Sequence, residues 1–480
     1  MNSPVGAGNP VAIHDSLIHV TDSVIELDLS VPWEPPEPPA PRRRLQARWV
    51  AAAAVLAVTL GVLVAGGPLP DGGRLYTVQV QVLEAQLAGG RLIIARYQPT
   101  APGPMIEARR ASDGALLWEH STDLQQTAVA GPDVVLLLTE SSTGDGVSNG
   151  LVVLDAATGK ELWSRPRIGF QGTNAAVVVV EEVRSTTPTI ITGLPDQDPG
   201  VNYARTTPER RFLGLAARTG TVVWDVTIPE GRDVDLGWAS PYQSRLVSFD
   251  ELSPTGQLTR RDARTGAVTE TRQLDWSGRS AMLGSGWLDG SGRVRDRLVV
   301  YPAGERGADV YDLATGGKLF RWAGDGGGTS LFRCTERIFC ANDGTGLTAV
   351  DITTGKPRWH LDGPGMVAGF AGERLLVGTF AQMNAIQPTL TGIVDSRTGT
   401  VVRKLADWRV LGTGGSRPLV WRPVDERTAI LGELDPATGT VAVFATAGNW
   451  FGDPACSVDG RFLACLVGGE LSVWRLPNRR

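Results

Sequence analysis

The sequence predicts an all-β fold, a β-propeller of four-stranded antiparallel blades. Three observations lead to this prediction: an apolar run followed by Thr-Gly and a second strand returns along the chain, an aspartate usually precedes the glycine by four residues, and an aromatic residue often follows it by four. The repeated glycines are Gly114, Gly159, Gly220, Gly266, Gly316, Gly355, Gly399 and Gly439. They are 39 to 61 residues apart, which suits a four-stranded blade. We expect eight blades, although seven or nine would also accommodate the pattern.

Each repeated glycine is expected to close a hairpin, because glycine adopts the positive φ angle of a tight turn without a Cβ clash. The aspartate four residues earlier, such as Asp155 before Gly159 or Asp351 before Gly355, can accept hydrogen bonds from backbone N–H groups inside the turn. Six aspartates recur at this place, so we expect a structural role and not a metal-binding or catalytic one. Two repeats carry Arg110 and Ala216 there instead, and their turns should be held less tightly.

The aromatic residue after the glycine is expected to pack between neighbouring blades. It is Trp118, Trp163, Trp224 or Trp359, and Phe320 takes this place once. An indole buries a large apolar area, and its N–H group can find an acceptor. Because these residues recur at one offset, we interpret them as core packing and not as ligand-stacking residues.

Two of the repeats carry a resemblance to a known family. Residues 154–163 (LDAATGKELW) and 350–359 (VDITTGKPRW) closely resemble the repeat of the PQQ-like β-propellers. The resemblance extends over roughly residues 76–480 and implies the propeller fold. The family includes quinoprotein dehydrogenases and also a non-enzymatic lipoprotein of outer-membrane assembly, so the resemblance implies no single activity.

The two ends of the repeat region are expected to meet. A last strand set without a Thr-Gly turn lies around residues 461–476 (RFLACLVGGELSVWRL). The run at residues 75–82 (LYTVQVQV) could pair with it across the seam of the ring. Such closure removes the exposed sheet edges that an open array would carry.

The N-terminal region differs in kind from the repeats. Residues 1–48 combine apolar and acidic residues with a proline-rich run at residues 32–41 (PWEPPEPPAP) and then Arg42, Arg43, Arg44 and Arg48. This composition predicts a disordered tail. Its segment at residues 22–31 (DSVIELDLSV) alternates apolar and acidic residues and could dock on a partner, although a solvated tail is the simpler interpretation.

A membrane span is expected after the tail. Residues 49–67 (WVAAAAVLAVTLGVLVAGG) contain no charge and are just long enough to cross a bilayer as a helix. Arginines precede this segment and none follows before Arg74, so the tail should be cytoplasmic and the propeller extracytoplasmic. Cleavage as a signal peptide is the alternative, but the apolar core begins unusually deep in the chain. A linker at residues 68–75 then leads to the propeller at residues 76–480.

The chain has four cysteines, Cys334, Cys340, Cys456 and Cys465. Each close pair brackets a turn-like stretch, so Cys334 should bond to Cys340 and Cys456 to Cys465 across neighbouring antiparallel strands. Zinc binding is the alternative, but no histidine lies near either pair in the sequence. Structural disulfides indicate an oxidising compartment.

Charge gives little information about partners. The net charge is −5, and only four of the 46 basic residues are lysines. Beyond residues 42–44 the basic residues form no run, so nucleic-acid binding is not expected. A composition rich in Ala, Gly, Arg and Val and poor in Lys suggests a GC-rich genome, and together with the expected cytoplasmic tail and single span it resembles that of an actinobacterial envelope protein.

Known catalytic patterns of the resembled family are missing from the sequence. Quinoprotein dehydrogenases hold PQQ over a calcium ion, commonly beside two adjacent cysteines, and this chain has no adjacent cysteines and no C-x-x-C-H haem motif. We therefore predict no catalytic, cofactor-binding or metal-binding residue and no cofactor. The expected function is a non-catalytic scaffold that binds another envelope or membrane protein or a ligand. The alternatives are a quinoprotein-type dehydrogenase and, second, a receptor that reports through the cytoplasmic tail.

Overall fold

The computed structural model describes residues 73–477 except residues 80, 98–102, 123–127, 142–147, 175, 183–206, 239–244, 279, 284–292, 295, 324–330, 336, 343–345, 364, 380–388, 406, 413–416 and 451. Residues 68–480 make up one compact unit. The tail predicted at residues 1–48 and the span predicted at residues 49–67 lie outside the described residues. Within the described residues, no helix is long and apolar enough to cross a membrane.

The described chain is all-β, and most of its strands form four-stranded antiparallel sheets. The first sheet along the chain contains β2 (Val82–Ala88), β3 (Arg91–Arg96), β4 (Met105–Arg110) and β5 (Leu116–Ser121), and the second contains β6 (Ala128–Ala130), β7 (Val134–Ser141), β8 (Ser148–Asp155) and β9 (Glu161–Pro166). The third contains β10 (Ile168–Asn174), β11 (Val177–Glu182), β12 (Arg210–Ala216) and β13 (Val222–Ile228), and the fourth contains β14 (Asp233–Trp238), β15 (Leu246–Leu252), β16 (Gln257–Asp262) and β17 (Val268–Gln273).

The remaining sheets continue this order. The fifth contains β18 (Ser280–Leu283), β20 (Arg297–Pro302), β21 (Ala308–Asp312) and β22 (Lys318–Trp322), with β19 (Arg293–Val294) paired to β20, and the sixth contains β23 (Leu331–Thr335), β24 (Ile338–Asn342), β25 (Gly346–Asp351) and β26 (Pro357–Asp362). The seventh contains β27 (Met366–Ala371), β28 (Arg374–Thr379), β29 (Thr389–Asp395), β30 (Val401–Lys404), β31 (Arg409–Gly412), β32 (Leu419–Pro423), β33 (Thr428–Leu434) and β34 (Val441–Gly448). The last joins β35 (Ala455–Asp459), β36 (Phe462–Val467) and β37 (Glu470–Arg475) to β1 (Arg74–Val78).

The eight-stranded sheet consists of two successive four-stranded arrays, β27 to β30 and β31 to β34. A single residue pair, Thr389 with Arg409, joins β29 to β31. By hydrogen bonding the eight strands form one sheet, whereas by strand order they form two four-stranded blades. For this reason the expected number of eight blades stays a prediction.

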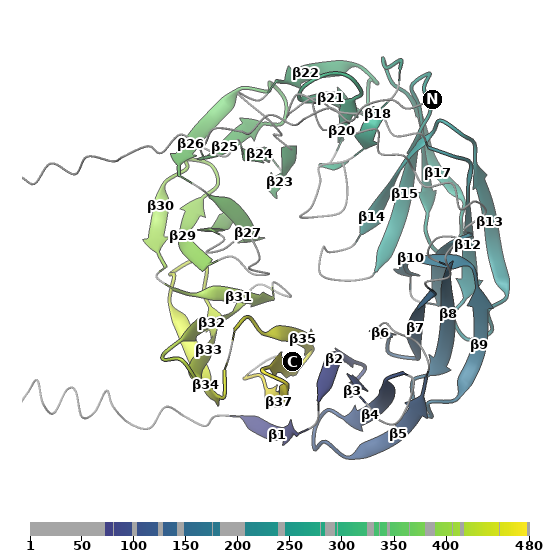
Figure 1. Ribbon diagram of the computed structural model, residues 1–480. Helices are drawn as coiled ribbons and strands as arrows, with labels where there is room; N and C mark the ends of the chain where they lie inside the picture. The colour runs from purple at the N-terminus through teal and green to yellow at the C-terminus, as the bar shows by residue number, and fades with distance from the viewer. Residues whose placement is uncertain are drawn as a thin grey trace, which may run out of the picture. The chain divides into compact units, whose positions relative to one another are not determined.

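Position within a sheet decides how a strand is buried. The second strands are short apolar runs buried on both faces, as in β3 and β11, whereas the fourth strands expose most of their residues, as in β5 and β30. Within this unit the first strands, such as β2 and β14, face the centre of a ring and the fourth strands, such as β5 and β30, lie on its outside (Figure 1). The core lies between successive sheets: Leu136 of β7, Val178 of β11 and Leu213 of β12 share one buried cluster.

The first and last strands of the unit close the ring. β1 pairs antiparallel with β37 in the register Tyr76 to Val473, and the two strands lie side by side in Figure 1. The predicted pairing across the seam is therefore present. The predicted strand at residues 75–82 is divided, however, because Val82 already begins β2 of the next sheet. The last strand set expected around residues 461–476 corresponds to β36 and β37.

Two disulfides are present, and each joins the innermost strand of a four-stranded sheet to the neighbouring strand. Cys334 of β23 bonds to Cys340 of β24 with their Cα atoms 5.5 Å apart, and Cys456 of β35 bonds to Cys465 of β36 with a Cα distance of 4.1 Å. This is the pairing expected from the sequence. No cysteine is free, so none is available as a zinc ligand.

Candidate functional site

Aromatic side chains connect successive sheets through the turn glycines. A Cβ atom added to Gly159 would lie 2.5 Å from the indole of Trp118, which stands on β5 of the preceding sheet. A Cβ atom on Gly355 would lie 2.4 Å from the ring of Phe320 on β22. The same approach joins Trp163 to Gly220, Trp224 to Gly266 and Trp359 to Gly399. We call this approach the docking contact. It means that the turn residue must lack a side chain and must also tolerate a positive φ angle, and glycine meets both requirements.

The indole N–H groups bind the next sheet as well. The donors and their backbone carbonyl acceptors are Trp118 Nε1 to Ala156 (3.0 Å), Trp163 Nε1 to Ala217 (2.9 Å) and Trp359 Nε1 to Ser396 (2.8 Å). Each acceptor lies three residues before the turn glycine that the same indole contacts. Trp118, Trp163 and Trp359 thus lie between sheets with both the ring and the N–H group engaged. Trp224 contacts Gly266 through its ring alone, because its buried Nε1 has no hydrogen-bond partner among the described residues.

Tyr76 makes the docking contact at the seam of the ring. A Cβ atom on Gly114 would lie 2.9 Å from the Tyr76 ring, and the Tyr76 hydroxyl donates to the carbonyl oxygen of Arg110 at 3.3 Å. Burial raises the pKa of Tyr76 to about 12, although the nearby Arg109 opposes this shift. Sequence reasoning missed Tyr76, because it precedes the first repeated turn and so has no offset from a glycine.

The turn aspartates hold the hairpins closed. Asp155 Oδ1 accepts the backbone N–H groups of Ala157 (3.0 Å) and Thr158 (2.9 Å), and Asp155 Oδ2 accepts from Arg218 Nη2 (2.7 Å). Arg218 lies in the turn of the next sheet, so Asp155 also connects two successive turns. The turns with Arg110 and Ala216 lack this acceptor but keep a 2.8 Å bond from the glycine N–H to the carbonyl oxygen four residues earlier. That these turns are held less tightly stays a prediction.

Asp351 gives the turns a pH dependence. Burial raises the pKa of Asp351, but hydrogen bonds from Arg358, from the backbone of Thr354 and Thr353 and from the Thr354 hydroxyl outweigh it and lower the pKa to about 2. The unperturbed pKa of an aspartate is 3.8, so the ionised Asp351 side chain stabilises the fold fully above that pH. This contribution is lost as the pH falls towards the lowered pKa of about 2.

We expect Asp351→Ala to lower the free energy of unfolding by on the order of 2 kcal/mol near neutral pH and by much less near pH 2. Denaturant unfolding at a series of pH values measures this difference. Glu426→Ala, which removes an exposed carboxylate, is the control and should cost little at any pH. A loss for Asp351→Ala that does not change with pH would contradict the assignment.

Buried carboxylates form a second group of candidate functional residues, and each has a cationic partner. Glu107 is 1% exposed and accepts from Arg96 Nε (3.2 Å) and Arg109 Nε (2.8 Å). The others are Asp250 with Arg260 (3.3 Å), Glu251 with Arg232 (3.3 Å) and Arg261 (3.0 Å), and Asp309 with Lys318 (2.7 Å). These ion pairs occupy the buried carboxylates within the sheets.

The described residues contain no cluster of three or more His, Cys, Asp or Glu side chains that could hold a metal ion. The sequence does contain one G-x-S-x-G pattern, at residues 146–150. In a nucleophile elbow this pattern forms a turn between a strand and a helix. Here Ser148 begins β8 and a strand, β9, follows, so the local structure does not match that use.

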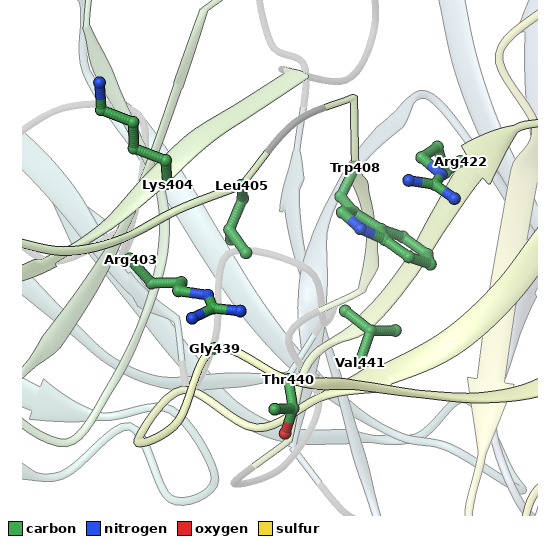
Figure 2. Close-up of a pocket in the computed structure, with 8 residues that line it drawn as sticks. All are labelled: Arg403, Lys404, Leu405, Trp408, Arg422, Gly439, Thr440 and Val441. Atoms are coloured by element: carbon green, nitrogen blue, oxygen red, sulfur yellow. The ribbon is translucent and has the colours of Figure 1, made fainter. Parts of the chain in front are cut away.

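A basic groove lies on the described surface. Its lining residues are Arg403, Lys404, Leu405, Trp408, Arg422, Gly439, Thr440 and Val441, and its volume is ≈ 410 Å³. Leu405 and Trp408 are buried and form the apolar floor together with Val441. The Arg422 guanidinium lies over the Trp408 ring, 5.1 Å from its centre (Figure 2). The lining combines three cations with apolar surface and includes no acidic residue.

The groove arises where the docking contact changes. Arg403 lies four residues after Gly399, the place of the tryptophan in other repeats, and its aliphatic stem lies against Gly439. Sequence reasoning did not single out Arg403 or its neighbours. A signal was available, since this position is aromatic in five of the eight repeats and is occupied by Arg403 here, with Glu270 and Val443 as the other two exceptions.

One family profile matches the chain. The profile of the family described as outer membrane protein assembly factor BamB matches residues 105–359, more than half of the chain. No curated protein sequence matches the chain.

Among solved structures, BamB from Moraxella catarrhalis is 15% identical, with 85% of this chain and 98% of that chain covered and a TM-score of 0.36. The WD40 domain of SCAP from fission yeast is 10% identical, with 86% and 98% covered and a TM-score of 0.37. A quinohemoprotein alcohol dehydrogenase from Pseudomonas putida is 12% identical, with 85% and 76% covered and a TM-score of 0.35. With identities and TM-scores this low, these likenesses carry no activity over to this chain.

Proposed function

Because the chain belongs to the PQQ-like β-propeller repeat family, whose profile is described as outer membrane protein assembly factor BamB, we propose that it is a membrane-anchored scaffold that binds other cell-envelope proteins. The propeller, residues 76–480, lies outside the cytoplasm in this proposal, the span at residues 49–67 anchors it, and it catalyses no reaction. The family match carries the proposal, because its description names an assembly factor.

Three features of the described residues support a binding role. The docking contacts and the β1–β37 pairing make a closed ring, which presents its surfaces in a fixed geometry. The buried carboxylates are neutralised by arginine or lysine and are therefore used within the sheets. The basic groove, in contrast, offers charges beside β30, a strand on the outside of the ring (Figure 1).

The topology can be tested in intact spheroplasts. Arg42, Arg43, Arg44 and Arg48 should hold the N-terminus in the cytoplasm, because positive residues that flank a span remain on that side. Added protease is expected to degrade residues 76–480 and to spare the tail, as followed with an antibody against each part. Permeabilised cells, in which both parts are digested, are the control. Protection of the propeller in intact spheroplasts would reverse the orientation.

An activity assay tests the scaffold against the dehydrogenase alternative. The purified full-length chain is incubated with PQQ and calcium, and bound quinone and the reduction of artificial electron acceptors by alcohols or sugars are measured. The proposal predicts neither a bound-quinone spectrum nor turnover, whereas a quinoprotein alcohol dehydrogenase treated in parallel should show both. Calcium-dependent turnover by this chain would overturn the proposal.

A further inference from the structure

The basic groove carries charges that the described part of the protein does not neutralise. Arg403, Lys404 and Arg422 take part in no ion pair with another described residue. The Arg422 guanidinium lies over the ring of Trp408. Most other arginines of the sheets are paired, as Arg109 is with Glu107, so the unpaired set stands out.

Arg403 is the residue that makes this place different from the other docking contacts. A tryptophan at the same position packs its ring against the turn glycine and donates its N–H group to a backbone carbonyl. Trp359, for example, packs against Gly399 and donates to the carbonyl oxygen of Ser396. Only the aliphatic part of Arg403 contacts Gly439, and its guanidinium extends over the groove (Figure 2). A guanidinium offers a planar fork of donors that fits a carboxylate or phosphate in bidentate fashion.

The neighbouring strands offer a place for extended backbone. β30 pairs only with β29, and β34 only with β33, among the described strands. All four residues of β30 are exposed, including Val401 (45%) and Val402 (40%). An edge strand with free N–H and C=O groups can accept a further strand from a partner.

We propose that the basic groove binds the carboxylates of an extended, acidic and apolar segment of a partner protein. The segment lies along β30, its acidic side chains meet Arg403 and Arg422, and its apolar side chains contact Trp408, Val401 or Val402. This inference rests on the proposed scaffold function and names the chemistry of its partner. The volume of ≈ 410 Å³ accommodates a few side chains of such a segment.

Phosphate chemistry would suit the two arginines equally well, and the form of the site decides between the two ligands. A phosphate site typically encloses its anion with backbone N–H groups, commonly at a helix N-terminus. This groove lies instead beside an edge strand and has an apolar floor of Leu405, Trp408 and Val441. These features favour a peptide, which has backbone, apolar and acidic groups to place.

Peptide binding to the full-length chain tests the inference. The probe is a fluorescent peptide that alternates glutamate and valine, and the matched probe alternates glutamine and valine. We expect Arg403→Gln/Arg422→Gln to weaken binding of the glutamate probe at least about tenfold. The control Arg264→Gln/Arg461→Gln removes the same charge at exposed arginines outside the groove and should change the affinity less than about twofold. Equal losses in both variants, or equal binding of both probes, would overturn the inference.

A second variant separates binding from folding. Arg403→Trp restores the residue that the other docking contacts use, so the unfolding temperature should not fall while binding of the glutamate probe is lost. Retained binding would overturn the proposed site. Displacement of the peptide by inorganic phosphate at an equal concentration would also overturn it and assign the groove to small anions. If the groove variants still bind their envelope partner in membranes, this inference fails while the proposed scaffold function stands.

Discussion

Replacing Gly355 by valine is expected to lower the free energy of unfolding by about 3 to 5 kcal/mol. Two effects add at this position. Gly355 has φ = +69°, which β-branched residues avoid, and its Cβ would lie 2.4 Å from the ring of Phe320. Phe320 is packed against a buried cluster and cannot move away at low cost. Denaturant and thermal unfolding of the full-length chain measure the loss.

Two further glycines separate these effects. Gly304 has φ = +78° but no atom within 4 Å of an added Cβ, so Gly304→Val should show the backbone cost alone, about 1 to 3 kcal/mol. Gly439→Val would meet the stem of Arg403, a side chain that can move, and should fall between the two. Equal losses at Gly304 and Gly355 would show that the docking contact does not stabilise the ring.

Glu251→Ala is expected to lower the free energy of unfolding by a similar amount, about 3 to 5 kcal/mol, because it removes the only counter-charge that the described residues give to two largely buried arginines. Glu251 is 2% exposed and accepts from Arg232 at 3.3 Å and Arg261 at 3.0 Å. Arg261 also donates to the carbonyl oxygen of Gly266 at 3.3 Å, so the substitution should loosen that turn. Unfolding experiments on the same protein measure the effect.

The surface pair of Glu373 and Arg397 is the matched control. Its N–O distance is 2.7 Å, but the two side chains are 49% and 67% exposed. Glu373→Ala should therefore cost less than about 1 kcal/mol. A loss at Glu251 no larger than that at Glu373 would mean that the buried carboxylates are not needed to hold the strands together.

Local rules were enough to predict the repeated turns. Thr-Gly with aspartate four residues earlier specifies a hairpin by backbone conformation and nearby hydrogen bonds, and Asp155 and Asp351 lie in such turns. The offset of the tryptophans indicated packing between blades for the same reason. The positive φ angle at Gly159 and Gly355 was predicted, but the need for a residue without a side chain was not. The ring that approaches each glycine comes from the preceding repeat and is not part of the local pattern.

Side-chain contacts that depend on the register of distant strands could not be predicted. The pairing of β1 with the last sheet was expected, but the contact of Tyr76 with Gly114 that results from it was not. The pairing of Glu251 with Arg232 and Arg261 likewise depends on the register of strands in the fourth sheet. The sequence shows that Arg403 stands where most repeats have an aromatic residue. The groove beside it, however, also needs Trp408 and Arg422, which come from later in the chain. The span at residues 49–67 lies outside the described residues and stays a prediction.

Crosslinking in intact membranes tests most directly whether the propeller is a binding scaffold. Proteins crosslinked under mild conditions to the full-length chain are identified by mass spectrometry and compared with those crosslinked to a truncated chain that ends at residue 72. The scaffold account predicts a small set of envelope proteins that appears with the full-length chain, is absent with the truncated chain, and is lost with Gly355→Val. Identical sets for the full-length and truncated chains would contradict it.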